Sequence, residues 1–126
     1  MDNRTVGIAL VVVAVFALTT AQLVIKTRLT VHGTVPFNVG DGLPYLLTVI
    51  ADWRMWAGLV GLMVSSLLWY AAVSRIPLSL AYPFGALSYP LIFLSSLLVL
   101  REEFSWQGLV GNGLIVMGVM LVASAT

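Results

Sequence analysis

The chain has 126 residues, of which 60% are hydrophobic and 9% are charged, and its formal net charge is +1 at pH 7. Charged residues make up about 25% of soluble globular domains, so the composition excludes an ordinary soluble domain. There is no cysteine, which excludes disulfides and thiolate chemistry. There is also no basic run of the kind that binds nucleic acid.

Four runs without a charged residue divide the sequence, and each is about 20 residues long or longer. Such a run is long enough to cross a bilayer as a helix, whereas barrel strands are about 10 residues long and alternate strictly. The first run is too long for the apolar core of a typical signal peptide, so we expect it to be retained. The sequence predicts an all-α membrane protein, one domain over residues 1–126, with four transmembrane helices at residues 5–25, 53–74, 76–100 and 104–124.

The first predicted span carries polar residues toward its end. Thr19, Gln22 and Lys26 are three and four residues apart, so they share one helical face. One interpretation is a polar stripe that leads from mid-membrane to the surface. The alternative is that Lys26 merely extends its ammonium to the surface while Gln22 makes one interhelical hydrogen bond.

Residues 26–52 form the longest connection between predicted spans. Residues 43–51 within it are apolar but too short to cross the membrane, which predicts a short helix on the membrane interface. His32 is the single histidine of the sequence. Without a cluster of histidines or carboxylates it predicts no metal site, and we expect it to be solvated in the loop.

The second predicted span has small residues along one side, at Gly58, Gly61 and Ser65, which permit close approach of another helix. Trp69 near its end suits either the aromatic belt at a membrane surface or the wall of a cavity. Arg75 is the only residue between this span and the next, so the two helices are expected to be neighbours.

The third predicted span is marked by prolines. Pro77 falls in the first turn, where the missing N–H costs little. Pro83 and Pro90 lie in the interior, where each removes a backbone hydrogen bond and favours a kink. One face of this span is small, hydroxyl-bearing or aromatic, which favours a kinked helix lining a groove over the alternative of simple helix packing. The residues of this face are Ser79, Tyr82, Ala86, Tyr89, Phe93 and Ser96.

The fourth predicted span has glycines on nearly one side, at Gly108, Gly111 and Gly118. Such a smooth seam favours tight packing against another helix. Four short helices leave limited interior volume for a solute path, so we expect this seam to be the interface with a second subunit.

Several short motifs also carry a family resemblance. Ile76-Pro77 with Leu80-Ala81-Tyr82, and Leu100-Arg101-Glu102 with the later glycines, resemble motifs of the small multidrug resistance transporters and of the wider drug/metabolite transporter superfamily. Within that superfamily the sequence looks most like the four-helix subunits that flip aminoarabinose-phosphoundecaprenol. The motifs behind this choice are Ala21-Gln22-Leu23, Trp69-Tyr70, Leu78-Ser79, Ala81-Tyr82 and Leu87-Ser88-Tyr89.

One departure from the multidrug transporters bears on function. Those proteins carry a glutamate in the first helix that binds the cationic drug and exchanges it for protons. Alignment on Lys26 puts Leu18 at that position, and none of the four predicted spans contains an acidic residue. An intramembrane carboxylate is the usual site for protons and cations, so the departure argues against proton-coupled export of cations.

The resemblance implies a flippase for a polyprenyl-phosphate-linked sugar, such as undecaprenyl phosphate-aminoarabinose, serving lipopolysaccharide or envelope modification in the bacterial inner membrane. The working unit would be a homodimer or a heterodimer with a related four-helix subunit. The alternatives are a small multidrug resistance-type exporter of small cationic or polar solutes, and a non-transporting accessory subunit of a membrane glycosyltransferase. No nucleotide-binding or catalytic motif is present, so we expect no enzyme activity, no catalytic residues and no cofactor.

The predicted substrate site combines cations at span ends with polar and aromatic groups between them. Lys26 is expected to contact the phosphate, with Arg28 close by. Glu102 pairs either with a basic headgroup or with Arg101. The residues expected to contact the sugar are Gln22, Trp69, Ser79, Tyr82 and Tyr89.

Overall fold

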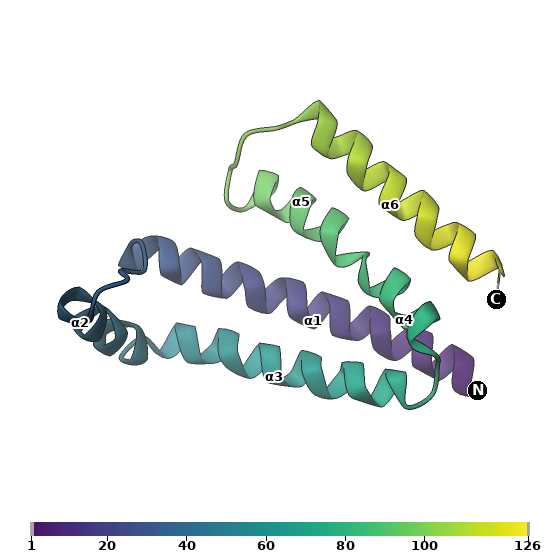
Figure 1. The fold of residues 1–126 in the computed structure, drawn as a ribbon, viewed down its shortest axis with the longest axis horizontal. Coiled ribbons are helices and arrows are strands. Elements are labelled where there is room, and N and C mark those ends of the chain that lie inside the picture. Colours follow the sequence, from purple (N-terminus) through teal and green to yellow (C-terminus); the bar gives the residue numbers. More distant parts are fainter. Residues whose placement is uncertain (1, 126) are drawn as a thin grey trace.

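The computed structural model describes residues 2–125, which form six helices and no strand (Figure 1). Four segments are long and apolar enough to cross a membrane, and α4 and α5 together make the third of them, Leu78–Leu98. The prediction of an all-α, four-span membrane protein is therefore confirmed. The helices are α1 (Asn3–His32), α2 (Val39–Ile50), α3 (Trp53–Val73), α4 (Leu78–Gly85), α5 (Ser88–Leu98) and α6 (Trp106–Ala125).

Helix α1 is 30 residues long and continues well past residue 25, the end of the predicted span. At about 1.5 Å per residue it measures about 45 Å, more than the hydrocarbon core of a bilayer. Its start is capped by the Asp2 carboxylate, which accepts a hydrogen bond from the Thr5 amide at 2.8 Å. It ends at Gly33, whose φ of 94° lies in the left-handed region that glycine adopts without strain.

The two longest helices, α1 and α3, run antiparallel in close contact (Figure 1). The Ser65 hydroxyl donates to the Ala14 carbonyl across this contact at 2.9 Å. A Cβ added to Gly58 would lie 2.6 Å from Cγ1 of Ile25, so the backbones approach this closely only because side chains are missing. We call this contact the small-residue seam. Buried small residues recur in it every seven positions, at Ala14 and Ala21 on α1 and at Gly58, Ser65 and Ala72 on α3, while Gly7, seven residues before Ala14, packs against Ile76 beyond the end of α3.

The hydrophobic core lies where the N-terminal half of α1, the end of α3 and the start of α4 meet. It fixes the short α3–α4 connection against α1. The second and third spans, expected to be neighbours, meet near this connection through Trp69 and Tyr82, while the third span contacts α1 along more of its length. The buried members of this cluster are Val11, Val15, Ala72, Ile76, Leu80 and Ala81.

The third span is broken between α4 and α5, at Ala86 and Leu87 (Figure 1). Pro90 has no N–H to donate to the Ala86 carbonyl four residues earlier. The Tyr89 amide donates to that carbonyl instead, at 3.1 Å. The kink predicted from the interior prolines is therefore confirmed at Pro90, whereas α4 stays continuous through Pro83.

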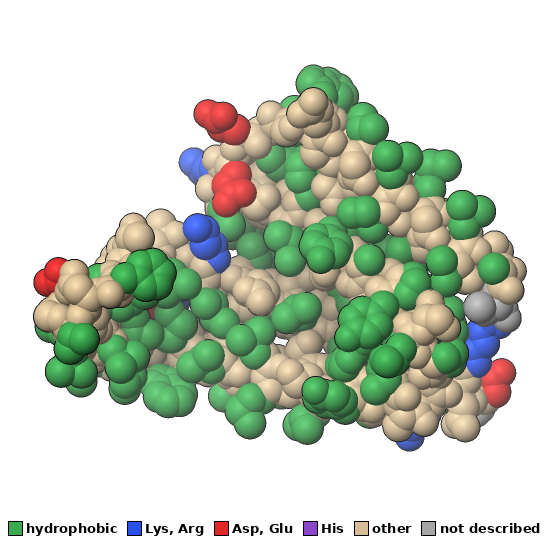
Figure 2. All heavy atoms as spheres, in the orientation of Figure 1, with side chains coloured by type: hydrophobic (Ala, Val, Ile, Leu, Met, Phe, Trp, Pro, Cys, Tyr) green, Lys and Arg blue, Asp and Glu red, His purple; other side chains and the backbone are tan. Residues whose placement is uncertain are grey.

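Helix α6 lies against α5 and leaves most of its surface open, with Val119 as its one buried residue. Aromatic rings of Phe93, Phe104 and Trp106 pack in sequence where the chain turns from α5 into α6. At the far end of α6, the Arg4 guanidinium donates to the Ala123 carbonyl at 3.2 Å. Figure 2 shows hydrophobic side chains across the middle of the visible face and charged side chains gathered toward its two ends, as a membrane-embedded body requires.

Helix α2 crosses the ends of α1 and α3 and begins earlier than the predicted residues 43–51 (Figure 1). The Asn38 side chain caps it by accepting from the Asp41 amide at 2.7 Å. The Tyr45 hydroxyl donates to the Gly33 carbonyl at 2.8 Å, which ties one side of α2 to the end of α1. The opposite side exposes Leu43, Leu46, Leu47 and Ile50. A place for α2 on the membrane interface remains a prediction, and this exposed apolar side is what such a place needs.

The small-residue seam predicts that Gly58→Ala destabilises the fold. A methyl group there overlaps Ile25, and overpacking of this kind costs about 1–3 kcal/mol. Gly113→Ala is the matched control, because a Cβ there has nothing within 4 Å and alanine suits a helix better than glycine. Thermal unfolding in detergent, followed by circular dichroism, measures both. Equal stability of the two variants would contradict the close approach of α1 and α3.

Candidate substrate cavity and its polar surroundings

A cavity of about 380 Å³ lies between α1, α3 and the broken third span. This volume falls in the range of pockets that hold small molecules. Its lining is mostly apolar and aromatic with a few hydroxyl groups, and no charged residue lines it. The lining residues are Ala14, Val15, Leu18, Ser65, Ser66, Trp69, Tyr70, Tyr82, Gly85, Ala86, Ser88 and Tyr89.

The break in the third span builds one wall of this cavity. Gly85, Ala86, Ser88 and Tyr89 all lie at or beside the break and all line the cavity. Pro90 interrupts the helical hydrogen bonds of this segment, and the residues on both sides of the interruption form the wall. The predicted polar and aromatic face is divided here, because Phe93 turns away toward α6, where a Cβ on Gly108 would lie 2.8 Å from its ring.

Aromatic side chains dominate the cavity. The rings of Trp69 and Tyr82 meet edge to face, with centroids 5.1 Å apart and planes inclined by 72°. Gly85 makes room for the indole, since a Cβ there would lie 3.2 Å from Cζ3 of Trp69. Of the two positions left open for Trp69, the structure places it in the cavity wall.

The polar residues of α1 continue from the cavity toward the surface. Leu18 lines the cavity, and Gln22 and Lys26 follow it at intervals of four residues on the same side of α1. The eight residues from Leu18 to Lys26 span about 12 Å along the helix. Gln22 and Lys26 are exposed and do not line the cavity itself.

Thr19, the first member of the predicted polar stripe, is buried with 6% of its surface exposed. Its hydroxyl has no hydrogen-bond partner among residues 2–125. A buried hydroxyl without a partner lowers the stability of the fold by about 1–3 kcal/mol. Thr19 places such a group on the α1 face that leads to Gln22 and Lys26.

The structure thus brings together part of the predicted substrate site. Trp69, Tyr82 and Tyr89 share the cavity. Ser79 is exposed in the first turn of α4 and is absent from the lining. Glu102 is exposed in the α5–α6 connection, and within residues 2–125 it pairs neither with Arg101 nor with any other basic side chain. A role in substrate binding remains a prediction for all of these residues.

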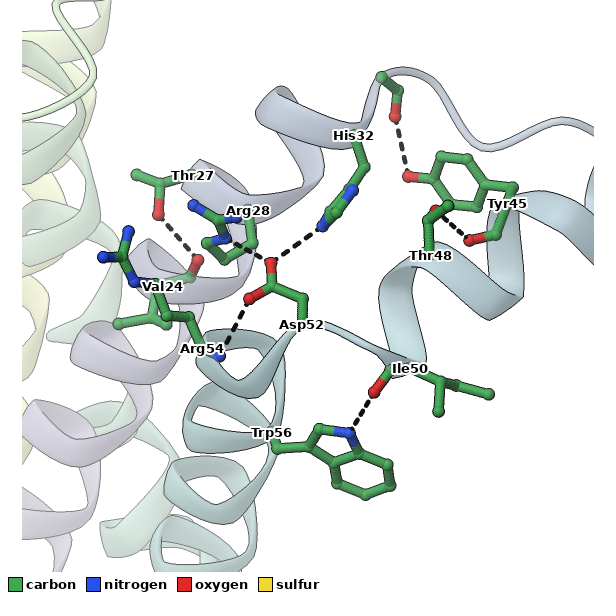
Figure 3. A network of polar contacts seen from close by, with 11 residues as sticks. Val24, Thr27, Arg28, His32, Tyr45, Thr48, Ile50, Asp52, Arg54 and Trp56 are labelled. Carbon is green, nitrogen blue, oxygen red and sulfur yellow. Dashed lines mark hydrogen bonds and ion pairs between the residues drawn. The ribbon is translucent and has the colours of Figure 1, made fainter.

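Arg28 belongs to a separate polar cluster at the end of α1 (Figure 3). Its Nε donates to Oδ2 of Asp52 at 2.5 Å, and Nε2 of His32 lies 2.9 Å from the same oxygen. The other Asp52 oxygen accepts from the Arg54 amide at 3.0 Å and so caps α3. The expectation that His32 is solvated in a loop is wrong, because α1 extends far enough to bring it against Asp52.

The Asp52 carboxyl is strongly acidic. Burial on its own raises its pKa, but the hydrogen bonds from Arg28, His32 and the Arg54 amide outweigh burial and lower the pKa from 3.8 to about 2. The side chain is only 7% exposed. Sequence reasoning missed Asp52, although an aspartate directly before a predicted helix is a recognisable N-cap signal.

The predicted glycine seam of α6 is also divided. Gly108 packs against Phe93 of the same chain, whereas a Cβ on Gly111 or Gly118 would meet nothing within 4 Å. These two positions therefore keep an open surface. Their contact with a second subunit remains a prediction.

Fold and cavity together define a small multi-pass membrane protein with an uncharged aromatic cavity beside a broken third span. Comparison with known proteins gives the family. The chain is 39% identical over 87 residues to the probable 4-amino-4-deoxy-L-arabinose-phosphoundecaprenol flippase subunit ArnF of Erwinia tasmaniensis, which covers 64% of the chain and 68% of that protein. It is 32% identical over 120 residues to the ArnF of Yersinia enterocolitica, covering 86% and 87%.

A probable subunit ArnE of Aeromonas salmonicida is 35% identical over 66 residues, covering 52% of the chain and 58% of that protein. No family model and no solved structure matches the chain. The chain belongs to the family of 4-amino-4-deoxy-L-arabinose-phosphoundecaprenol flippase subunits. The resemblance drawn from the short motifs is confirmed, and the relatives' names indicate transport rather than catalysis.

The Asp52 cluster predicts a pH-dependent stability. Because the folded pKa lies below the unfolded value, the stabilisation is fully present above pH 3.8 and is lost as the pH falls toward 2. The difference in unfolding temperature between the wild type and Asp52→Asn should shrink as the pH falls from about 4 to 2. Thermal unfolding across this range measures it, with Glu103→Gln at an exposed carboxylate as the control. A difference that does not change with pH would refute the role of the ionised Asp52.

The unpaired Thr19 hydroxyl predicts that removing it affects stability differently from removing the paired Ser65 hydroxyl. Thr19→Val removes a buried group without a partner and should leave stability unchanged or raise it by about 1 kcal/mol. Ser65→Ala removes a buried hydroxyl that is paired with the Ala14 carbonyl and should lower stability by about 1 kcal/mol. Denaturation of both variants in the same detergent gives the comparison. Equal losses would show that Thr19 has a partner in the folded protein.

Proposed function

We propose that this protein is one subunit of a flippase that carries polyprenyl phosphate bearing aminoarabinose, or a similar glycolipid, across the bacterial inner membrane. Its family membership supports this function. The structural observation that carries the proposal is the uncharged aromatic cavity beside the broken third span, with Lys26 about 12 Å further along α1.

Each part of such a glycolipid has a matching surface. The phosphate needs a cation, and the exposed ammonium of Lys26 supplies one. The sugar needs aromatic faces and hydroxyl groups, which the cavity supplies through Trp69, Tyr82 and Tyr89. In this assignment Arg28 does not bind substrate through its Nε, because Asp52 already holds that atom.

The polyprenyl tail can remain in the lipid throughout. Tyr70, Tyr82 and Tyr89 line the cavity and yet are 67%, 63% and 62% exposed. The cavity is therefore open at the side of the subunit rather than enclosed. A headgroup can enter it from the membrane while the apolar tail stays outside.

The multidrug-exporter alternative is weakened by the positions of the acidic residues. All five carboxylate side chains lie outside the four spans, at Asp2, Asp41, Asp52, Glu102 and Glu103. Proton-coupled exchange of a cation usually depends on a carboxylate inside the membrane.

The working flippase contains, in this proposal, a second four-helix subunit of the same or a related kind. The relatives include subunits named ArnE and ArnF. The open surface at Gly111 and Gly118 suits close contact with another helix. The accessory-subunit alternative needs the same contact, so transport assays must separate the two.

The role of Lys26 can be measured in proteoliposomes that hold the protein with its partner subunit and a fluorescent polyprenyl-phosphate sugar. Lys26→Ala should slow transfer roughly tenfold or more, because it removes a charge-assisted hydrogen bond. Lys26→Arg should retain most of the transfer. Arg75→Ala is the control, since Arg75 bonds the Ala71 carbonyl at the opposite end of α3.

Unchanged transfer by Lys26→Ala would exclude Lys26 as the phosphate contact. Proton-coupled efflux of ethidium from the same vesicles would instead favour the exporter. A rise in the activity of a partner glycosyltransferase without any lipid movement would favour the accessory subunit.

A further inference from the structure

The cavity has the composition of a site for a cation, although it contains no anion. Four of its lining residues are aromatic: Trp69, Tyr70, Tyr82 and Tyr89. The faces of tryptophan and tyrosine rings carry partial negative charge and attract ammonium groups, the more strongly where water is excluded. Rings that converge on one cavity are how proteins bind ammonium ligands without a carboxylate.

The other polar side chains in the cavity are neutral. No carboxylate lines the cavity, and the Ser65 hydroxyl donates its hydrogen to the Ala14 carbonyl, so only its oxygen can face a cation. Ser66 and Ser88 are the remaining serines in the lining. A cation that enters therefore meets aromatic rings and serine oxygens rather than an opposite charge.

The arrangement of the rings supports this role. The planes of Trp69 and Tyr82 are inclined by 72°, so the two rings form a corner rather than a flat stack. Tyr82 and Tyr89 are more than half exposed within the third span, and no residue in the described range 2–125 hydrogen-bonds their hydroxyls. Both tyrosine rings are therefore open to a ligand that enters the cavity from the side.

We propose that this aromatic cavity recognises the protonated amino group of the sugar, and that the subunit thereby prefers aminosugar lipids over neutral ones. The inference rests on the proposed flippase function. It also orients the headgroup: the anionic phosphate lies on the side of the cavity toward which the Lys26 side chain extends along α1, and the ammonium, which Lys26 repels, lies one sugar ring away among the aromatic side chains.

The test compares two lipids that differ at one small group: the fluorescent polyprenyl phosphate bearing the 4-aminosugar, and the same lipid with a neutral 4-hydroxyl group in place of the amine. Both are assayed in proteoliposomes that contain the full chain with its partner subunit. The wild type should move the amine form roughly three- to thirtyfold faster. Tyr82→Phe keeps the aromatic face and should keep this ratio, whereas Tyr82→Leu removes the face and should bring the ratio toward one.

Tyr89→Leu provides a second aromatic deletion should Tyr82→Leu fail to fold, which thermal unfolding reveals. Loss of the ratio in Tyr82→Phe would assign recognition to the hydroxyl and overturn the proposal. Equal transfer of both lipids by the wild type would overturn it as well, while the flippase function would stand. Transfer of neither lipid would contradict the flippase function itself, and the two failures are thus distinguishable.

Discussion

The close approach of α1 and α3 is the contact on which the rest of the structure depends. In lipid there is no hydrophobic driving force between helices, so association relies on van der Waals contact and interhelical hydrogen bonds. The seven-residue recurrence of small residues on both helices supplies the contact, and the bond from Ser65 to the Ala14 carbonyl supplies the polar link. The same two residues line the cavity. The seam that holds the helices together therefore also fixes the floor of the candidate site.

The third span packs less closely on α1 than α3 does. The cavity exists because a closely packed helix pair is combined with this broken third span. A span that packed along α1 as closely as α3 does would fill the cavity with side chains. Pro90 breaks the helix at Ala86 instead, and the chain on either side of the break contributes cavity residues. The core around Ile76 and Leu80 holds the start of this span in place. One end of the span is thus anchored, while the middle bends around an open volume.

Sequence reasoning reached the features that depend on local pattern and missed those that depend on distant contacts. The thickness of a bilayer sets the length of a membrane span, so the charge-free runs were enough to predict the four spans. An interior proline removes a hydrogen bond within its own helix, so the kink could also be predicted from local sequence. Ser65 was recognisable as a small residue, but its partner Ala14 lies in a valine-rich run where no pattern marks the contact. The contact of His32 with Asp52 joins residues 20 positions apart through the course of α2, which no periodicity encodes.

The placement of charge bears on how such a subunit could release what it binds. A carboxylate in the cavity would hold an ammonium strongly, and release would then require a proton to neutralise it. Aromatic faces hold the same group by about 0.5–2 kcal/mol, which thermal motion overcomes without a proton. The phosphate contact proposed here is likewise an exposed lysine rather than a buried one, so water and salt screen its charge. A translocator must bind on one side and let go on the other, and two weak contacts at the ends of one headgroup meet both requirements without coupling to a proton gradient.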